Sequence, residues 1–247
     1  MALNTDPAVV DSLTALEQIT DTLPEIRTDT IIRLTDDDYR EVAEHLGVET
    51  AAIKAVVDIE AGRAHQGFFA PGKPIINFDL TMFRRFARKH GINLSRYNGS
   101  HAIVFSRPNA RRHGSTQAAQ HARLNAARGI DDVTAIEGTF WGMFQIGGFN
   151  WKLCGCDDIH DFVNKMSTSE RAQLDLFAEF IRRQGLDKYL RNKNWAAFAS
   201  RYNGPSYASR GYHTRMASAY ARHKKLEAAT AKSTTAKSAT AEAAPVE

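Results

Sequence analysis

Apolar residues recur at helical spacing along most of the chain, with polar residues between them. This pattern predicts helices that each bury one face against a shared core. Short apolar runs at Pro74–Phe78 and Ala102–Phe105 are instead typical of strands. Together they predict a mainly α (α+β) fold with a small β element. The predicted helices cover about 36–46, 51–60, 81–90, 115–128, 132–145, 158–165, 168–184, 194–202 and 207–226.

Capping residues mark several of the predicted helix ends. Thr35 precedes three aspartates, and an acidic first turn suits the positive end of a helix dipole. Thr50 is predicted to cap the second helix, with Gly62 just beyond its end. Ser167 and Glu170 have the spacing of a capping box, which predicts the start of the helix at 168.

The chain divides into three segments by composition. Residues 1–33 form a weakly patterned extension, and residues 34–226 carry nearly all the large apolar side chains. Residues 227–247 consist mostly of Ala, Thr, Ser and Lys. Such a tail buries too little surface to offset the entropy of ordering, so we expect a frayed helix end followed by disorder.

The N-terminus lacks the basic and apolar regions of a signal peptide. No apolar run approaches the roughly 20 residues that a transmembrane helix needs. We therefore expect synthesis in the cytoplasm, without a signal peptide or a transmembrane segment. Cys154 and Cys156 are too close together for an easy disulfide and too few for a zinc site, which predicts two ordinary thiols.

The net charge is +4, and the charged residues are unevenly distributed along the chain. Residues 80–130 contain no Asp or Glu. Such a basic surface could bind nucleic acid, attract the anionic cell envelope, or be merely solvated. No nucleic-acid-binding motif accompanies it, so no nucleic-acid partner is expected. The basic residues are Arg84, Arg85, Arg88, Lys89, Arg96, Arg107, Arg111, Arg112, Arg123 and Arg128.

Glu60 is the first candidate for chemistry. It follows Ile53, Val56 and Val57 at i+7, i+4 and i+3, so all four lie on the face that the helix must bury. Burial disfavours a charged carboxylate and raises its pKa, which suits a general acid. The alternative is that Glu60, as the last helical residue, turns out into water.

A second candidate is the glycine-rich segment Trp141–Phe149. Glycines such as Gly142 let backbone approach a ligand closely, and the amide of Gln145 can both donate to and accept from a sugar. The backbone near Gly142 and Phe144 is the predicted contact surface. The alternative is a core helix that ends in a glycine turn.

The third candidate is Phe198–Pro205, in which an aromatic-Asn-Gly sequence precedes proline. Here Tyr202 would present its phenol to the catalytic carboxylate, and Asn203 would hold the turn. The alternative is a simple helix terminus, because Asn-Gly followed by Pro stops a helix by itself.

In this order the three candidates resemble the lysozyme superfamily, including goose-type lysozymes and lytic transglycosylases. The closer resemblance is to the N-acetylmuramidase family of phage endolysins and bacteria, and it covers about 35–224. It implies a lysozyme-like helical domain that cleaves the glycan strands of peptidoglycan without a metal or cofactor. The segments that carry it are Ile59–Gly62, Pro74–Asp79, Gln120–Leu124, Trp141–Asn150, Ser169–Leu174 and Trp195–Gly204.

The chain departs from the family pattern after two of these segments. Ala61 stands where the wider superfamily often has serine, so a small hydrogen-bonding residue is missing. Asp79 is followed by Leu-Thr, where the family usually has Glu followed by Arg-His. Residues 95–114 also match less well.

A second carboxylate would assist as a base about 6.5–9.5 Å from the acid in an inverting enzyme, or as a nucleophile about 5–5.5 Å away in a retaining one. Asp79 is the first candidate and Glu137 the second. The alternative is that both are structural and that Glu60 is the sole essential carboxylate.

The resemblance predicts a monomeric peptidoglycan hydrolase that cleaves the β-1,4 bond between N-acetylmuramic acid and N-acetylglucosamine, with Glu60 as acid. Release through a holin, as for an endolysin, or through a secretion machine would bring it to the cell wall. One alternative is a lytic transglycosylase that forms 1,6-anhydromuramic acid. Another is a non-catalytic glycan-binding or nucleic-acid-binding protein on the same fold.

Overall fold

The computed structural model describes residues 30–61, 66–106 and 116–242, with side chains up to residue 232. The chain divides into two units, Met1–Thr30 and Ile31–Glu247. Nearly all of the first lies outside the described residues, as does most of the predicted extension 1–33. The second unit starts slightly before the predicted boundary, because the backbone N–H of Leu34 and the Arg33 guanidinium both donate to Glu170.

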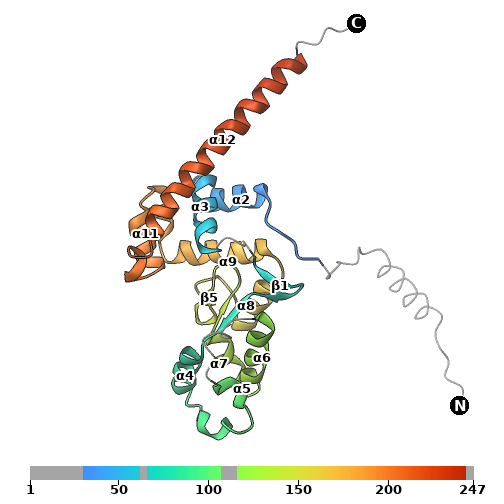
Figure 1. The fold of residues 1–247 in the computed structure, drawn as a ribbon, viewed down its shortest axis with the longest axis vertical. Coiled ribbons are helices and arrows are strands. Elements are labelled where there is room, and N and C mark those ends of the chain that lie inside the picture. The colour runs from blue at the N-terminus through green and yellow to red at the C-terminus, as the bar shows by residue number, and fades with distance from the viewer. Residues whose placement is uncertain (1–29, 62–65, 107–115, 243–247) are drawn as a thin grey trace, which may run out of the picture. The chain divides into compact units, whose positions relative to one another are not determined.

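Within the second unit, a group of helices lies on one side of α9 (Figure 1). We call this group the helical lobe: α2 (Asp36–Leu46), α3 (Thr50–Glu60), α10 (Asp187–Arg191), α11 (Trp195–Tyr202) and α12 (Tyr212–Glu242). Thr35 caps α2 in a capping box with Asp38, as the sequence predicted. Thr50 is wrongly predicted as a cap: it lies inside α3, and the N-cap residue Glu49 makes no side-chain cap.

The other side of α9 carries a small antiparallel sheet and its helices, which we call the sheet lobe. Its strands are β3 (Ile76–Phe78), β4 (Thr139–Trp141) and β5 (Ile146–Gly147), in that order. A separate hairpin pairs β1 (Phe68–Ala70) with β2 (Lys73–Pro74). The helices are α4 (Leu80–Lys89), α5 (Ala102–Phe105), α6 (Gln117–Arg128), α7 (Asp132–Glu137) and α8 (Ile159–Met166), with short 3-10 turns η1 (Leu94–Tyr97) and η2 (Gly148–Asn150).

Helix α9 (Glu170–Arg183) joins the two lobes. On the helical-lobe side its Arg171 makes ion pairs with Asp38 and Glu41 of α2. Towards the sheet lobe it packs on α8. Its N-cap is Ser169, whose side chain accepts from the backbone N–H of Ala172, so the predicted capping box from Ser167 is wrong.

Two predicted elements of the sheet lobe are wrong. Residues Ala102–Phe105 form the short helix α5 rather than a strand, because a four-residue apolar run looks the same in a buried helix and in a strand. The predicted helix 132–145 ends at Glu137 and continues as β4, the turn and β5. β-Branched and aromatic residues at 139–141 favour a strand, and Gly142 has a positive φ of 70° that a helix cannot contain.

The predicted C-terminal helix is also wrong at both ends. Residues Pro205–Tyr207 form the 3-10 turn η3, and α12 starts at Tyr212 and runs to Glu242. It therefore passes residue 226, where a frayed end and a disordered tail were predicted. Alanine has the highest helix propensity, which favours continuation of this helix even where little is buried.

The predicted fold class is confirmed: the described part of the second unit is mainly helical, with few and short strands. Aromatic and aliphatic side chains from both lobes and α9 form one core cluster. None of the described helices is both long and apolar enough to cross a membrane. Cys154 and Cys156 are free, buried thiols, and burial raises the pKa of Cys156 to about 11.

Candidate active site

Glu60 is the last residue of α3, and its position confirms the predicted apolar face. Ile53, Val56 and Val57 on that face have no exposed surface. The Glu60 carboxyl group is largely shielded from water, and this burial raises its pKa to about 7. A carboxyl group with this pKa is still half protonated at neutral pH, as a general acid requires.

Asn203 holds the Glu60 carboxyl group directly. Its Nδ2 donates to both carboxylate oxygens, Oε1 and Oε2, at 3.1 Å each. These hydrogen bonds and the positive charge of Arg215 lower the pKa of Glu60, but burial has the larger effect. The Asn203 Oδ1 atom is buried and has no hydrogen-bond partner among the described residues. It is therefore a buried acceptor next to the Glu60 carboxyl group with its bonding capacity unused.

Tyr202 does not contact Glu60 by a hydrogen bond, contrary to the prediction for this residue. Its hydroxyl donates to the backbone carbonyl of Phe144 at 3.3 Å. The ring packs against Phe177 and Phe198, so the phenol lies in the core. Burial, with a smaller effect of the Glu60 charge, raises the pKa of Tyr202 well above its usual range. Tyr202 thus joins α11 to the turn after β4, while the neighbouring Asn203 contacts the acid.

The turn between β4 and β5 supplies the second predicted motif. Gly142 and Gln145 both have positive φ, 70° and 49°, and both the backbone N–H and the side-chain Nε2 of Gln145 donate to the Gly142 carbonyl. Gly142 and Phe144 are buried, and the Phe144 ring stacks on Phe177 with centroids 4.1 Å apart. Gln145 is exposed. Of the three predicted ligands in this motif, only Gln145 presents a side chain to solvent.

Gln173 of α9 holds this turn through a hydrogen bond to Met143, a role that the sequence pattern did not predict. Its side chain is fully buried: Oε1 accepts from the backbone N–H of Met143, and Nε2 donates to the carbonyls of Gly67 and Met166. A Cβ atom on Gly142 would lie 2.8 Å from Gln173 Oε1, so only glycine fits there. The position of Gln173, a polar residue on the apolar face of α9, is the feature of the sequence that could have indicated this role.

Glu170, one turn earlier on α9, is also buried, and it binds neighbouring segments instead of forming the predicted capping box with Ser167. Its carboxylate accepts from the backbone N–H of Gly67 and Leu34 and pairs with Arg33. Glu170 and Gln173 thus fix Gly67, at the end of the segment that follows Glu60. Gln173 thereby connects Gly67 to Met143 in the β4–β5 turn.

Asp79, the predicted second carboxylate, is the N-cap of α4. Its Oδ1 accepts from the backbone N–H of Thr81 and Met82. Among the described residues it makes no hydrogen bond or ion pair with Glu60. Glu137, the other candidate, is buried and bonded to His90 Nε2 at 2.6 Å. The structure gives each of these carboxylates a local structural role.

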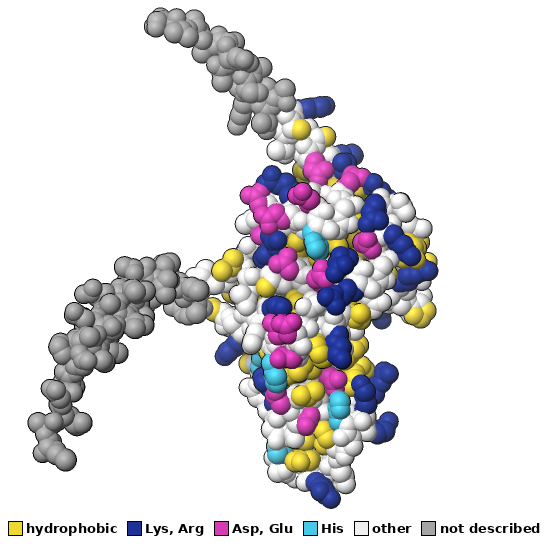
Figure 2. All heavy atoms as spheres, turned by 180° about the vertical axis from the view of Figure 1, so that it is seen from behind, with side chains coloured by type: hydrophobic (Ala, Val, Ile, Leu, Met, Phe, Trp, Pro, Cys, Tyr) yellow, Lys and Arg dark blue, Asp and Glu magenta, His cyan; other side chains and the backbone are white. Residues whose placement is uncertain are grey.

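Two of the basic residues in the segment 80–130 bind other parts of the fold. Arg123 is buried, donates to the Val104 carbonyl and lies over the Phe78 ring, while Arg128 pairs with Asp132. Figure 2 shows one face on which Lys and Arg side chains lie among Asp and Glu. Some of the basic residues in this segment therefore stabilise the fold and do not contribute to a free basic surface. Arg107, Arg111 and Arg112 lie outside the described residues.

The site thus combines a carboxyl group of raised pKa at a helix end, an asparagine that holds it and a glycine turn that contacts α9 and α11. Residues 49–224 match the family model described as Muramidase, N-acetylmuramidase. This chain belongs to the N-acetylmuramidase family. It is a glycoside hydrolase that acts on peptidoglycan.

A solved structure supports this assignment. The chain is similar to the crystal structure of a Burkholderia AP3 phage endolysin, with 34% sequence identity and a TM-score of 0.68. The match covers 79% of this chain and 72% of the endolysin chain. No curated protein sequence matches this chain.

Proposed function

We propose that this muramidase hydrolyses the β-1,4 bond between N-acetylmuramic acid and N-acetylglucosamine, with Glu60 as the general acid. The observation that carries the proposal is a carboxyl group with a pKa of about 7, held by two hydrogen bonds from Asn203. Glu60 would protonate the glycosidic oxygen as the bond to the muramic acid ring breaks. Water would then attack the oxocarbenium-like ring carbon and release the new reducing end.

The groups around Glu60 support saccharide binding. The exposed amide of Gln145 can both donate to and accept from a sugar hydroxyl or N-acetyl group. Gly142, Phe144 and Tyr202 would contribute indirectly, because their buried contacts fix the turn that carries Gln145. No metal or organic cofactor enters this mechanism.

The central test compares Glu60→Gln with the wild type in the loss of turbidity of purified cell walls. We expect the substitution to lower the rate by about 10²–10⁴-fold, the usual contribution of a positioned acid. Glu44→Gln, on the exposed side of α2, is the matched control and should keep full activity. Full activity of Glu60→Gln would overturn the proposal and would leave a glycan-binding protein that retains only the fold.

A second test concerns the reaction type. Hydrolysis leaves a muramic acid reducing end, whereas a lytic transglycosylase leaves an anhydro sugar that is lighter by one water. Mass spectrometry of the released fragments separates the two. Anhydro products would show that the muramic acid 6-hydroxyl, and not water, attacks the ring.

Asp79 is proposed as the base that activates the water, through the Oδ2 atom that does not cap α4. Asp79→Asn keeps a capping acceptor and removes the charge. If Asp79 is the base, this variant should lose about 10²–10⁴-fold in kcat at an unchanged Tm. Activity equal to that of the wild type would show that Asp79 only caps α4.

The biological role that we propose is that of an endolysin, because the similar solved structure is a phage endolysin. Release to the wall would then need a holin. Expression of the chain in a bacterial host should leave the cells intact until a holin is expressed with it. Prompt lysis without a holin would contradict this route.

A further inference from the structure

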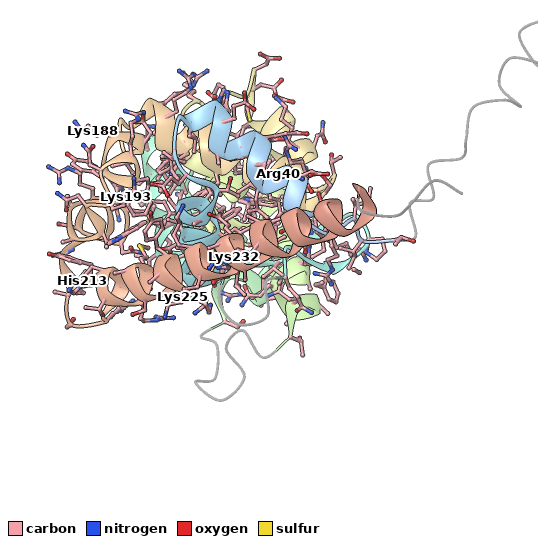
Figure 3. All side chains as sticks on the ribbon, turned by 90° about the horizontal axis from the view of Figure 1, so that it is seen from above. Arg40, Lys188, Lys193, His213, Lys225 and Lys232 are labelled. Atoms are coloured by element: carbon pink, nitrogen blue, oxygen red, sulfur yellow. The ribbon has the colours of Figure 1, made fainter. Side chains whose placement is uncertain are left out.

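A polar pocket lies between α3 and α12, at the end of α3 that carries Glu60. It has a volume of about 590 Å³, and its lining includes Ile59, the residue before Glu60. We call it the α3–α12 pocket. Figure 3 shows α12 crossing the helical lobe, with His213 near the start of the helix. The other side chains that matter here are Asp58, Thr214, Arg215, Ser218 and Arg222.

The charges of the α3–α12 pocket leave one cation free. Asp58 makes ion pairs with Arg222 and with His223, so its negative charge is compensated. Arg215 is exposed and has no carboxylate within ion-pair distance among the described residues. The guanidinium instead lies over the Tyr212 ring, 5.9 Å from its centroid. With two arginines and one carboxylate, the lining has an excess of one positive charge.

A charge in the pocket also acts electrostatically on the carboxyl group of Glu60. Arg215 lines the same pocket as Ile59, the residue before Glu60, and its positive charge lowers the pKa of Glu60. The exposed hydroxyls of Thr214 and Ser218 stand on the same stretch of α12. A guanidinium fork with hydroxyls beside it is suited to a planar anion such as a carboxylate.

We propose that the α3–α12 pocket binds a carboxylate of the peptide attached to the muramic acid unit that is being cleaved. This inference rests on the proposed function, because it assigns to the pocket a second part of the same substrate. The peptide branches from the sugar next to the scissile bond, and each extended residue reaches about 3.5 Å. A side branch can therefore reach Arg215 while the sugar contacts Glu60.

A singly charged carboxylate fits the pocket better than a phosphate group. The excess is a single positive charge, which a singly charged carboxylate neutralises and a doubly charged phosphate would exceed. An exposed ion pair of this kind contributes modestly to binding. The expected effect on kcat/KM is about two- to fivefold.

The experiment compares purified sacculi with the same sacculi after treatment with carbodiimide and excess ammonium. This treatment converts the peptide carboxylates to amides and leaves phosphates and glycan unchanged. The measured quantity is the ratio of kcat/KM on untreated and amidated sacculi at a single pH. Any change in the pKa of Glu60 cancels in this ratio, because the same acid cleaves both substrates.

For the wild type we expect a ratio of about two to five in favour of untreated sacculi. Arg215→Gln should bring the ratio close to one. Ser218→Glu should do the same, because a carboxylate there lies at i+3 from Arg215 and i−4 from Arg222 and competes with the ligand. Arg210→Gln, an exposed arginine outside the pocket, should keep the wild-type ratio.

A wild-type ratio of one would overturn the pocket assignment while leaving the cleavage reaction intact. A ratio that survives both Arg215→Gln and Ser218→Glu would place the carboxylate site elsewhere on the protein. Failure of the proposed function has a different signature, since Glu60→Gln would then cleave both kinds of sacculi as fast as the wild type.

Discussion

Replacement of Asn203 by alanine should move the alkaline limit of activity to higher pH. In the folded protein Asn203 Nδ2 stabilises the charged form of Glu60 through two contacts of 3.1 Å. A hydrogen bond to a charged group contributes about 1.5–3 kcal/mol, and the lower figure applies at a site that is not fully buried. Since about 1.4 kcal/mol corresponds to one pKa unit, the pKa of Glu60 should rise by about one unit.

The size of the effect follows from the fraction of protonated acid. With a pKa of about 7, roughly one in eleven Glu60 side chains is protonated at pH 8. With a pKa near 8 about half would be protonated, a gain of about fivefold. The activity of Asn203→Ala at pH 8, relative to its own maximum, should therefore exceed the wild-type value by about fivefold.

The assay is the pH dependence of kcat/KM on purified cell walls, which reports the acid of the free enzyme. Asn194→Ala is the matched control: Asn194 caps the other end of α11 and makes no contact with Glu60 among the described residues. It should keep the wild-type alkaline limit at a reduced Tm. An Asn203→Ala profile that coincides with the wild type, or shifts to lower pH, would refute the argument.

Two further predictions concern stability. The folded-state pKa of Glu60, about 7, lies above its usual value of 4.5. Burial of the charged carboxylate therefore destabilises the folded protein. This cost is absent below pH 4.5, grows up to about pH 7 and is complete above that. Glu60→Gln should therefore gain about 1–3 kcal/mol over the wild type in urea unfolding at pH 8 compared with pH 4, and an equal difference at both pH values would contradict this. Gly142→Ala should cost about 2–4 kcal/mol, because its new methyl group would meet Gln173 Oε1 in a backbone with positive φ. Gly72→Ala, with a similar φ of 67° but open space around it, should cost only about 1 kcal/mol, and equal losses would rule out the clash.

Local patterns predicted much of the helical lobe. The apolar face of α3 and the Thr35 cap of α2 depend on residues only a few positions apart, and both were correct. The same holds for the position of Glu60 on that face. Such features follow from helix periodicity and from short-range hydrogen bonds, which the sequence contains directly.

The turn after β4 was mispredicted because its conformation is set at long range. Trp141 pairs with Ile76 across the sheet, and Met143 donates to Gln173, 30 positions along the chain. These partners favour a strand and a tight turn over the helix that the local pattern suggested. Helix propensity is weak enough for such contacts to override it.

The roles within the site were likewise decided by tertiary structure. The sequence pattern identified both Tyr202 and Asn203 as candidates, but Tyr202 was predicted to face Glu60, and Asn203 does so instead. Adjacent residues at a helix end point in different directions, so one side chain enters the core and the other reaches the carboxyl group. The sequence by itself therefore determined the buried face of α3 and the position of Glu60 on it, while the tertiary contacts at the end of α11 decided which side chain holds the Glu60 carboxyl group.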